Sequence, residues 1–324
     1  MLGMSRIYYL LRNGHLSADE EVFRFDTMDR MARIPVERVE ALEIHGGCNI
    51  SSGALKLASE HNIPIHVFGY YGNYMGTYWP KERFFSGDLT IKQALLYNDP
   101  EWRKDISFRL IQGIIDNMIR VLRRFDGNSS DIIRPSPGSS IEELMLMEAR
   151  ARREYYARLD QILPEDFMIL SREKRPPTNY GNCLISFGNS LLYSAIVTEA
   201  RKTSVNITIP FYHSPSAGRF SLALDIAEIF KPGLVDRFIL QVTRQGIIKP
   251  STEHFMKEGN GILLNETGRK VFLEQWDKWL DTTNKHKRMK RKVSNRELLR
   301  FELHKYAKEV EGIEKYHPIE LPLN

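Results

Sequence analysis

The hydrophobic and polar positions of this chain follow two different periods, and the change between them predicts two kinds of structure. Up to about residue 89, apolar residues gather in short runs or alternate with polar ones, which is typical of β-strands. The runs that predict strands are 7–11, 22–26, 34–36, 41–44 and 65–68. The first two flank an Asn13-Gly14 turn, so we expect them to pair as a hairpin.

Two other segments of this β-rich region carry distinct patterns. Residues 51–62 repeat small apolar side chains on one side and predict a short helix. Residues 69–76 are rich in tyrosine and glycine. Such a run can stack nucleobases, but a tight hairpin with aromatic cross-strand pairs is the interpretation we favour.

From about residue 90 the apolar residues recur every three or four positions, which predicts amphipathic helices. The expected helices are 91–125 with a break near Asp99-Pro100, 140–159, 183–201, 219–231, 235–244, 268–280 and 297–310. The fifth, 235–244, is expected to be separate because Pro232 and Gly233 stop the helix before it. We therefore expect an α+β protein with a β-rich N-terminal domain over 1–89 and a larger helical domain over 90–324.

The stretch from Phe211 to Pro232 combines an apolar helix with candidate chemistry. Asp225 and Glu228 lie three residues apart, so both carboxylates project from one side of the helix, and His213 precedes the turn that leads into it. Two carboxylates and an imidazole are costly to bury without a cation. A metal site is one interpretation; a solvated helix face with a structural histidine is the other.

A second acidic candidate lies on the helix expected over 140–159. Ser140 and Glu143 form a capping box at its start, and the apolar stripe that follows places Glu148 on the side facing the core. A carboxylate there either ligates a cation or pairs with an arginine, and Arg152, four residues on, could be that partner. Glu148 is the natural third carboxylate for the group of His213, Asp225 and Glu228.

Composition and charge narrow the class of protein. The 324 residues are 42% hydrophobic, which is enough for a sizeable core, and Cys48 and Cys183 are too few for a disulfide framework or a cysteine metal site. No apolar run approaches the length that spans a bilayer, and the N-terminus lacks the apolar region of a signal peptide. We expect a soluble, cytoplasmic protein with no membrane partner. There is no Walker loop or dinucleotide fingerprint, and nothing supports a serine or cysteine nucleophile.

The net charge of +5 and the pI of about 9.0 are compatible with a nucleic acid partner. Seven cations fall within residues 285–296, which is either a solvated arm or a set of phosphate contacts. The candidates for holding phosphate, chosen by charge and by nearness in sequence, are Arg219, Lys287, Arg288, Lys290, Arg291 and Lys292.

Three segments together carry a resemblance to a known family: MEARARREYY at 147–156, NCLISFGNSLLY at 182–193, and residues 211–232. They resemble the CRISPR-associated protein one family. The resemblance extends in the expected order through 34–37, 69–80 and 262–272, and so covers nearly the whole chain.

That resemblance implies an N-terminal β-sandwich-like domain joined to a larger all-α catalytic domain. It implies a metal-dependent DNA endonuclease and integrase that inserts short DNA fragments into a CRISPR array by phosphodiester transesterification, in antiviral defence. The family's metal-ligating glutamate falls on Glu148, its histidine on His213 and its last acidic ligand on Glu228, where many relatives carry aspartate. Asp225 matches an additional acidic residue of the same helix.

The implied cofactor is Mg²⁺ or Mn²⁺, because one imidazole among carboxylates suits either ion. The implied partners are double-stranded DNA, a second copy of the chain joined through the N-terminal domain, and CRISPR-associated protein two. Two other functions fit the same residues: a general nuclease for branched DNA or RNA in repair, and a non-catalytic nucleic-acid-binding module that uses the basic run and the tyrosine-rich hairpin.

Overall fold

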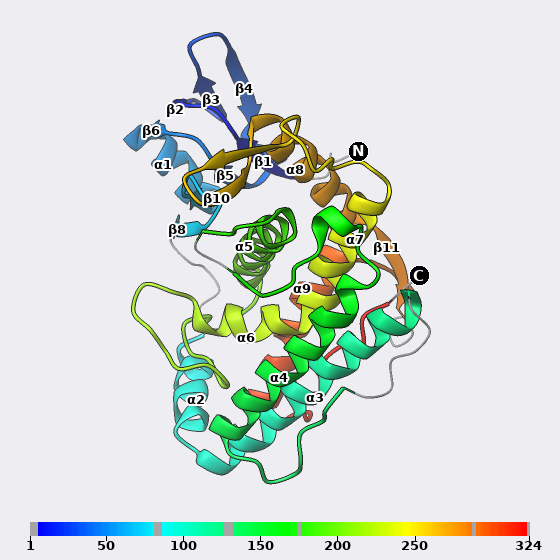
Figure 1. Ribbon diagram of the computed structural model, residues 1–324. Coiled ribbons are helices and arrows are strands. Elements are labelled where there is room, and N and C mark those ends of the chain that lie inside the picture. The colour runs from blue at the N-terminus through cyan, green and yellow to red at the C-terminus, as the bar shows by residue number, and fades with distance from the viewer. Residues whose placement is uncertain (1–5, 81–85, 126–131, 174–175, 287–289, 323–324) are drawn as a thin grey trace. The chain divides into compact units, whose positions relative to one another are not determined.

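The computed structural model describes residues 6–80, 86–125, 132–173, 176–286 and 290–322, and the chain divides into two compact units. The first unit is Met1–Arg83 and the second is Phe84–Asn324 (Figure 1). The expected break at 89/90 falls inside helix α2 (Gly87–Tyr97). The helix begins before its first buried apolar residue because the hydroxyl of Ser86 accepts the backbone N–H of Leu89 and caps it.

The first unit consists of two four-stranded sheets with the strand orders β1-β5-β7-β8 and β4-β3-β2-β6. The strands are β1 (Arg6–Leu10), β2 (Gly14–Asp19), β3 (Val22–Asp26), β4 (Met31–Pro35), β5 (Val39–Ile44), β6 (Cys48–Ile50), β7 (Ile65–Phe68) and β8 (Tyr74–Tyr78). A short 3-10 helix, Val36–Arg38, precedes β5, and helix α1 (Ser52–Glu60) follows β6.

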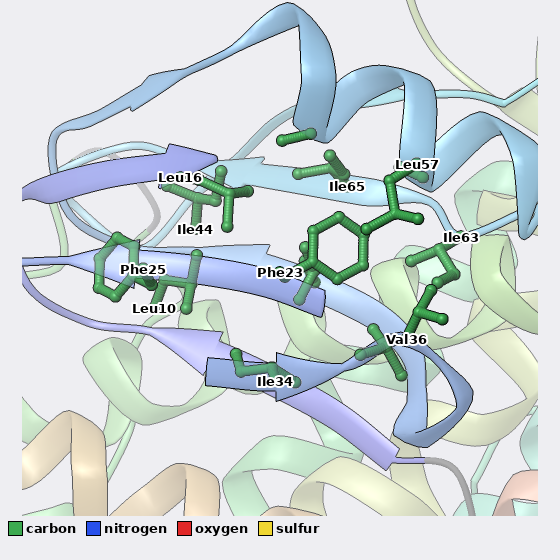
Figure 2. Close-up of a cluster of buried hydrophobic side chains, with 14 residues drawn as sticks. Leu10, Leu16, Phe23, Phe25, Ile34, Val36, Ile44, Leu57, Ile63 and Ile65 are labelled. Atoms are coloured by element: carbon green, nitrogen blue, oxygen red, sulfur yellow. The ribbon is translucent and has the colours of Figure 1, made fainter. Parts of the chain in front are cut away.

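One apolar cluster takes side chains from both sheets (Figure 2). Leu10 and Ile44 come from the first sheet, and Leu16, Phe23 and Ile34 come from the second. Two sheets that share one core form a sandwich-like unit, so this part of the expected fold is confirmed. The tyrosine-rich segment is also the expected hairpin: β7 and β8 pair antiparallel, with Phe68 opposite Tyr74.

The predicted pairing of residues 7–11 with 22–26 is wrong. Strand β1 pairs in parallel with β5 in one sheet, whereas β3 pairs antiparallel with β2 in the other. Gly14 does not make the turn; it starts β2, where a Cβ would lie 2.5 Å from the carbonyl oxygen of Asp26. The turn comes after Asp19, where Glu20 adopts a positive φ of 50°.

The second unit is mainly helical. Its helices are α2, α3 (Pro100–Phe125), α4 (Ile141–Asp160), a 3-10 turn (Glu165–Phe167), α5 (Tyr180–Ala200), α6 (Ser221–Phe230), α7 (Arg237–Arg244), α8 (Glu266–Asp281) and α9 (Asn295–Val310). The expectation of an all-α domain needs a correction, because two strand pairs interrupt it. These are β9 (Phe255–Glu258) with β10 (Gly261–Leu264), and β11 (Thr283–His286) with β12 (Arg291–Ser294).

Helix α5 is the central helix of this unit, and it packs against α6 and α9. By length and composition alone it could cross a bilayer, with a mean hydropathy of 1.2 over its apolar window, which corrects the expectation that no such run exists. In the fold, 83% of that window is buried. Apolar side chains on all sides of α5 are what the central helix of a packed core also requires.

The expected stop at Pro232 and Gly233 is also wrong. A π-helical segment, Lys231–Asp236, carries the chain from α6 directly into α7. The N–H of Arg237 reaches the carbonyl of Pro232, five residues back. Pro232 lies at the start of this segment, where the missing N–H of a proline is tolerated. Gly188 of α5 allows this segment to approach closely, since a Cβ there would lie 2.8 Å from Val235 Cγ1.

Candidate metal centre

Asp225 of α6 anchors the segment that carries His213. The carboxylate is fully buried. Its Oδ2 accepts the backbone N–H groups of Phe211 and Tyr212 at 2.8 and 3.0 Å, and its Oδ1 accepts that of His213 at 3.0 Å. Oδ1 also lies 2.6 Å from Nδ1 of His213. Because a carboxylate only accepts, Nδ1 carries the proton and Nε2 is left as the ring nitrogen available to a metal.

Arg103 of α3 holds the same segment from its other side. Its Nε donates to the carbonyl of Phe211 at 2.9 Å, and its terminal nitrogen donates to the carbonyl of Tyr212 at 3.1 Å. The guanidinium also lies over the ring of Tyr97, 4.4 Å from the centroid. The amides before His213 are therefore bound by Asp225 and the carbonyls by Arg103, which fixes the imidazole through the backbone.

His213 shares the electrostatic environment of both candidate glutamates. Burial lowers the pKa of its imidazole, but the hydrogen bond and charge of Asp225 raise it, as do the charges of Glu228 and Glu148, and the net pKa is raised. The ring of Tyr212 lies edge-on to the imidazole, 5.1 Å between centroids. The three predicted ligands therefore lie close enough in the second unit for their charges to interact.

Glu148 of α4 is reached from two directions. Its Oε2 accepts the hydroxyl of Tyr212 at 2.8 Å, and its Oε1 accepts Nε of Arg152 at 2.8 Å. Burial, together with the charge of Glu148 and this hydrogen bond, raises the pKa of the Tyr212 phenol, which therefore stays protonated as a donor. The pair of Glu148 with Arg152 was one of the two interpretations that the sequence left open.

Arg152 also contacts the second glutamate. One of its terminal nitrogens forms an ion pair with Oε2 of Glu228, and Lys231 pairs with Oε1 of the same carboxylate. Burial alone would raise the pKa of Glu228, but the charges of Arg152 and Lys231 outweigh it and lower that pKa to about 2. One guanidinium thus bridges the two carboxylates that the resemblance assigns to the metal.

The donor set suits a hard divalent cation, since two carboxylates and an imidazole with a free Nε2 are the ligands that Mg²⁺ and Mn²⁺ accept. As the side chains stand, however, no group of three His, Cys, Asp or Glu residues in the described part of the chain is arranged to hold a metal ion. The physical reason is the bridge: the guanidinium of Arg152 already supplies positive charge to Glu148 and Glu228.

The other predicted residues lie as follows. Both oxygens of Asp225 are used by the backbone and the imidazole, so Asp225 positions His213 and is not free to coordinate. Arg219 is exposed and donates to the carbonyl of Ser214, which closes the loop after His213. The described part of the basic run forms the strand pair β11–β12, with Lys290 at the turn and Arg291 paired to Glu297. Lys287 and Arg288 lie outside the described residues.

Three contributors were missed by reasoning from the sequence. Lys231 follows Glu228 by three residues, a helical ion-pair spacing that could have been noticed. Tyr212 is adjacent to His213 but gives no sign that its hydroxyl reaches Glu148. Arg103 lies more than a hundred residues before the segment it holds, and no local pattern predicts such a contact.

A model of the family described as CRISPR associated protein Cas1 matches residues 8–278 of the chain. The chain belongs to the Cas1 family. The CRISPR-associated endonuclease Cas1 of Methanocaldococcus jannaschii is 40% identical over 313 residues, covering 96% of this chain and 97% of the relative. This shows the resemblance to be one of descent over nearly the full length, and it identifies the class of activity as that of a CRISPR-associated endonuclease.

Solved structures agree with the assignment to Cas1. A Cas1 protein from Thermotoga maritima has a TM-score of 0.86 at 33% identity, covering 97% of this chain and 100% of that one. A casposase bound to an integration product has the same TM-score at 16% identity, covering 98% and 94%. At that identity the second likeness shows a common fold only.

Proposed function

We propose that this chain is a metal-dependent DNA endonuclease and integrase that inserts short DNA fragments into a CRISPR array. The observation that carries the proposal is the cluster of Glu148, His213 and Glu228, with Asp225 and Arg103 fixing the backbone of the imidazole. Membership of the Cas1 family supports it.

Glu148, Glu228 and Nε2 of His213 would hold Mg²⁺ or Mn²⁺. When bound, the ion supplies Lewis-acid polarisation of the scissile phosphodiester and positions the attacking oxygen. In the integrase reaction a DNA 3′-hydroxyl forms the new P–O bond while the scissile P–O bond breaks, and its oxygen leaves as a 3′-hydroxyl. When water is the nucleophile, the product is a nick.

The chain's own residues orient the side chains that would take part in this step. Asp225 keeps the imidazole in the tautomer that presents Nε2. Tyr212 holds one oxygen of Glu148, and Lys231 holds one oxygen of Glu228. The second oxygen of each glutamate is then directed to the proposed metal position. Preorganised donors of this kind lower the reorganisation that the reaction requires.

The strand pair β11–β12 is the surface that we assign to the DNA backbone. Lys285 and Lys292 face each other directly across the two strands, and both are exposed. Like charges in opposite positions destabilise a strand pair unless an anion lies between them, and phosphate is such an anion. Replacing both lysines with glutamine should weaken duplex binding and reduce the dependence of the binding constant on salt by about two phosphate contacts.

Lys249 and Lys257, both outside this strand pair, provide a matched double replacement. Lys249 pairs with Glu253 at 3.0 Å and Lys257 lies exposed on β9. Removal of the same two charges there should leave the salt dependence unchanged. Equal effects in the two pairs would remove the assignment of DNA to β11–β12.

The function itself is tested with a substrate panel and metal. We expect joining of DNA 3′ ends into repeat DNA, with Mn²⁺ or Mg²⁺, in the presence of the proposed partner, CRISPR-associated protein two, and in a homodimer of this chain. Glu148→Gln should abolish joining. Efficient cutting of branched DNA without any joining would favour a general repair nuclease, and metal-independent binding without cutting would favour a non-catalytic module.

A further inference from the structure

A third carboxylate lies close enough to Arg152 to be an alternative partner for its guanidinium. Asp236, at the end of the π-helical segment, is completely buried. Neither of its carboxylate oxygens has a hydrogen-bond partner among the described residues. Burial raises the pKa of Asp236 to about 7, although the charge of Arg152 and the nearby hydroxyl of Tyr155 act to lower it. A buried carboxylate with no firm partner is rare, because its desolvation is not compensated.

The charges around Asp236 identify the cation that could serve it. Three cations act on its carboxylate electrostatically: Arg152, Lys231 and Arg172. Lys231 is paired with Glu228. Arg172 is engaged by the side chains of two α5 residues, Asn182 at 2.8 Å and Ser186 at 3.0 Å.

Arg152 is the one of these three that pairs with both proposed metal-ligating glutamates, Glu148 and Glu228. A divalent ion between Glu148 and Glu228 would repel the guanidinium and take over its charge balance. Asp236 would then offer an uncommitted carboxylate within electrostatic range of the same side chain. Tyr212 and Lys231 would keep their hold on the outer oxygens of the two glutamates.

We propose that Arg152 is an internal counter-ion that exchanges partners with the metal: it bridges Glu148 and Glu228 in the metal-free protein and pairs with Asp236 when the ion binds. The proposal rests on the metal site of the proposed function. Under this scheme the guanidinium competes with the ion, so the measured affinity is the intrinsic affinity reduced by the fraction of open sites. Asp236 favours the form in which Glu148 and Glu228 are free to bind the metal, because it pairs with the displaced guanidinium of Arg152.

The test is a double-mutant cycle on the full chain, stripped of metal and titrated with Mn²⁺ alone while free Mn²⁺ is followed by electron paramagnetic resonance. Arg152→Met removes the competitor and should tighten Mn²⁺ binding about tenfold. Asp236→Asn removes the alternative partner and should weaken binding about tenfold, but only while Arg152 is present. The double variant should bind like Arg152→Met.

Two further variants control for charge and for folding. Arg153→Met removes an exposed arginine next along α4 and should leave Mn²⁺ affinity unchanged. Arg152→Lys keeps a cation but cannot span both carboxylates, so its affinity should lie between those of wild type and Arg152→Met. This variant keeps the cycle interpretable if the methionine variant folds poorly.

Arginine Nε–H resonances give a readout that needs no change in affinity. The Nε–H of Arg152, identified by its loss in Arg152→Lys, should shift when Mg²⁺ saturates the wild-type protein. In Asp236→Asn the end point of that shift should differ. An unchanged resonance, or an effect of Asp236→Asn that persists without Arg152, overturns the exchange.

The outcomes separate this proposal from the proposed function. Mn²⁺ binding that depends on Glu148 and Glu228 but is indifferent to Arg152 overturns the exchange alone. Absence of Mn²⁺ binding in both wild type and Arg152→Met overturns the exchange and the metal-dependent function together. Binding by Arg152→Met but not by wild type would be the strongest support for competition.

Discussion

Asp225 and Glu228 lie three residues apart on helix α6, yet their carboxylates are satisfied in opposite ways. Asp225 accepts hydrogen bonds from three backbone N–H groups and from Nδ1 of the His213 imidazole. Glu228 is held by the side-chain cations of Arg152 and Lys231. Backbone donors cannot leave without unfolding the segment, whereas side-chain cations can rotate away. The first arrangement suits a permanent anchor and the second suits an exchangeable ligand.

The largest effect is expected at the permanent anchor. Asp225→Asn places an amide NH₂ among backbone N–H donors and leaves some of them buried without an acceptor. We expect a loss of about 4 kcal/mol in the free energy of unfolding and no measurable joining of DNA ends. Denaturant unfolding and the joining assay check it. A variant with near wild-type stability would show that the three N–H groups find other acceptors, and would remove the distinction drawn above.

Acid titration tests the exchangeable side. Glu228 has a pKa of about 2 in the folded protein against an ordinary value of 4.5. Its ion pairs therefore contribute stability that is fully present above pH 4.5 and is lost as the pH falls towards 2, on the order of 3 kcal/mol. Glu228→Gln lacks this contribution, so the stability gap between variant and wild type should narrow over that range. A gap that stays constant down to pH 2.5 would contradict the cationic environment of Glu228.

Arg103 tests whether the anchor needs its second support. Arg103→Met removes two hydrogen bonds to the carbonyls before His213 and should cost about 2 kcal/mol of stability. It should also weaken Mn²⁺ binding, which a purely structural role would not do. Arg103→Lys should restore part of both. Lys104→Met, whose side chain pairs with Glu101 at the surface, is the matched control and should change neither.

Tyr212 connects the segment held by Asp225 with Glu148, and its replacement should give the smallest loss of stability. Tyr212→Phe keeps the ring beside His213 but removes the hydroxyl donated to Glu148. The expected cost is about 1 kcal/mol of stability, with a modest fall in Mn²⁺ affinity and no change in the pH profile of unfolding near pH 2 to 4.5. Calorimetry and metal titration measure both. A loss as large as that of Asp225→Asn would mean that Glu148 also depends on a fixed anchor.

Sequence patterns predicted the local parts of this molecule well. The capping box is formed: Ser140 accepts the N–H of Glu143, and the Glu143 carboxylate accepts the N–H of Ser140. Local hydrogen bonds of this kind depend on neighbouring residues alone. The spacing of Asp225 and Glu228 likewise placed both on one short helix.

The errors arose where partners far along the chain decide the outcome. The spacing of Asp225 and Glu228 could not show that Asp225 holds the backbone and does not bind metal. The N–H groups that bond to Asp225 come from a segment outside its helix. The strand pairing failed because β1 finds its partner in β5, beyond the nearer candidate β3. Pro232 was taken as a stop, but it lies at the start of a π-helical segment that packs against α5 and carries the chain into the next helix.

The π-helical segment Lys231–Asp236 sets the rotation of α7 about its axis relative to α6. Each residue of an α-helix advances the side chains by about 100° around the axis. Removing Gly233, and with it the surplus residue, would rotate α7 by about that angle relative to α6. Phe238 and Val242, now buried, would swing towards water, and Gln241 and Arg244 would be driven into the core. A single extra backbone residue thus keeps the apolar face of α7 turned towards the core while α6 presents Asp225 and Glu228 to the site.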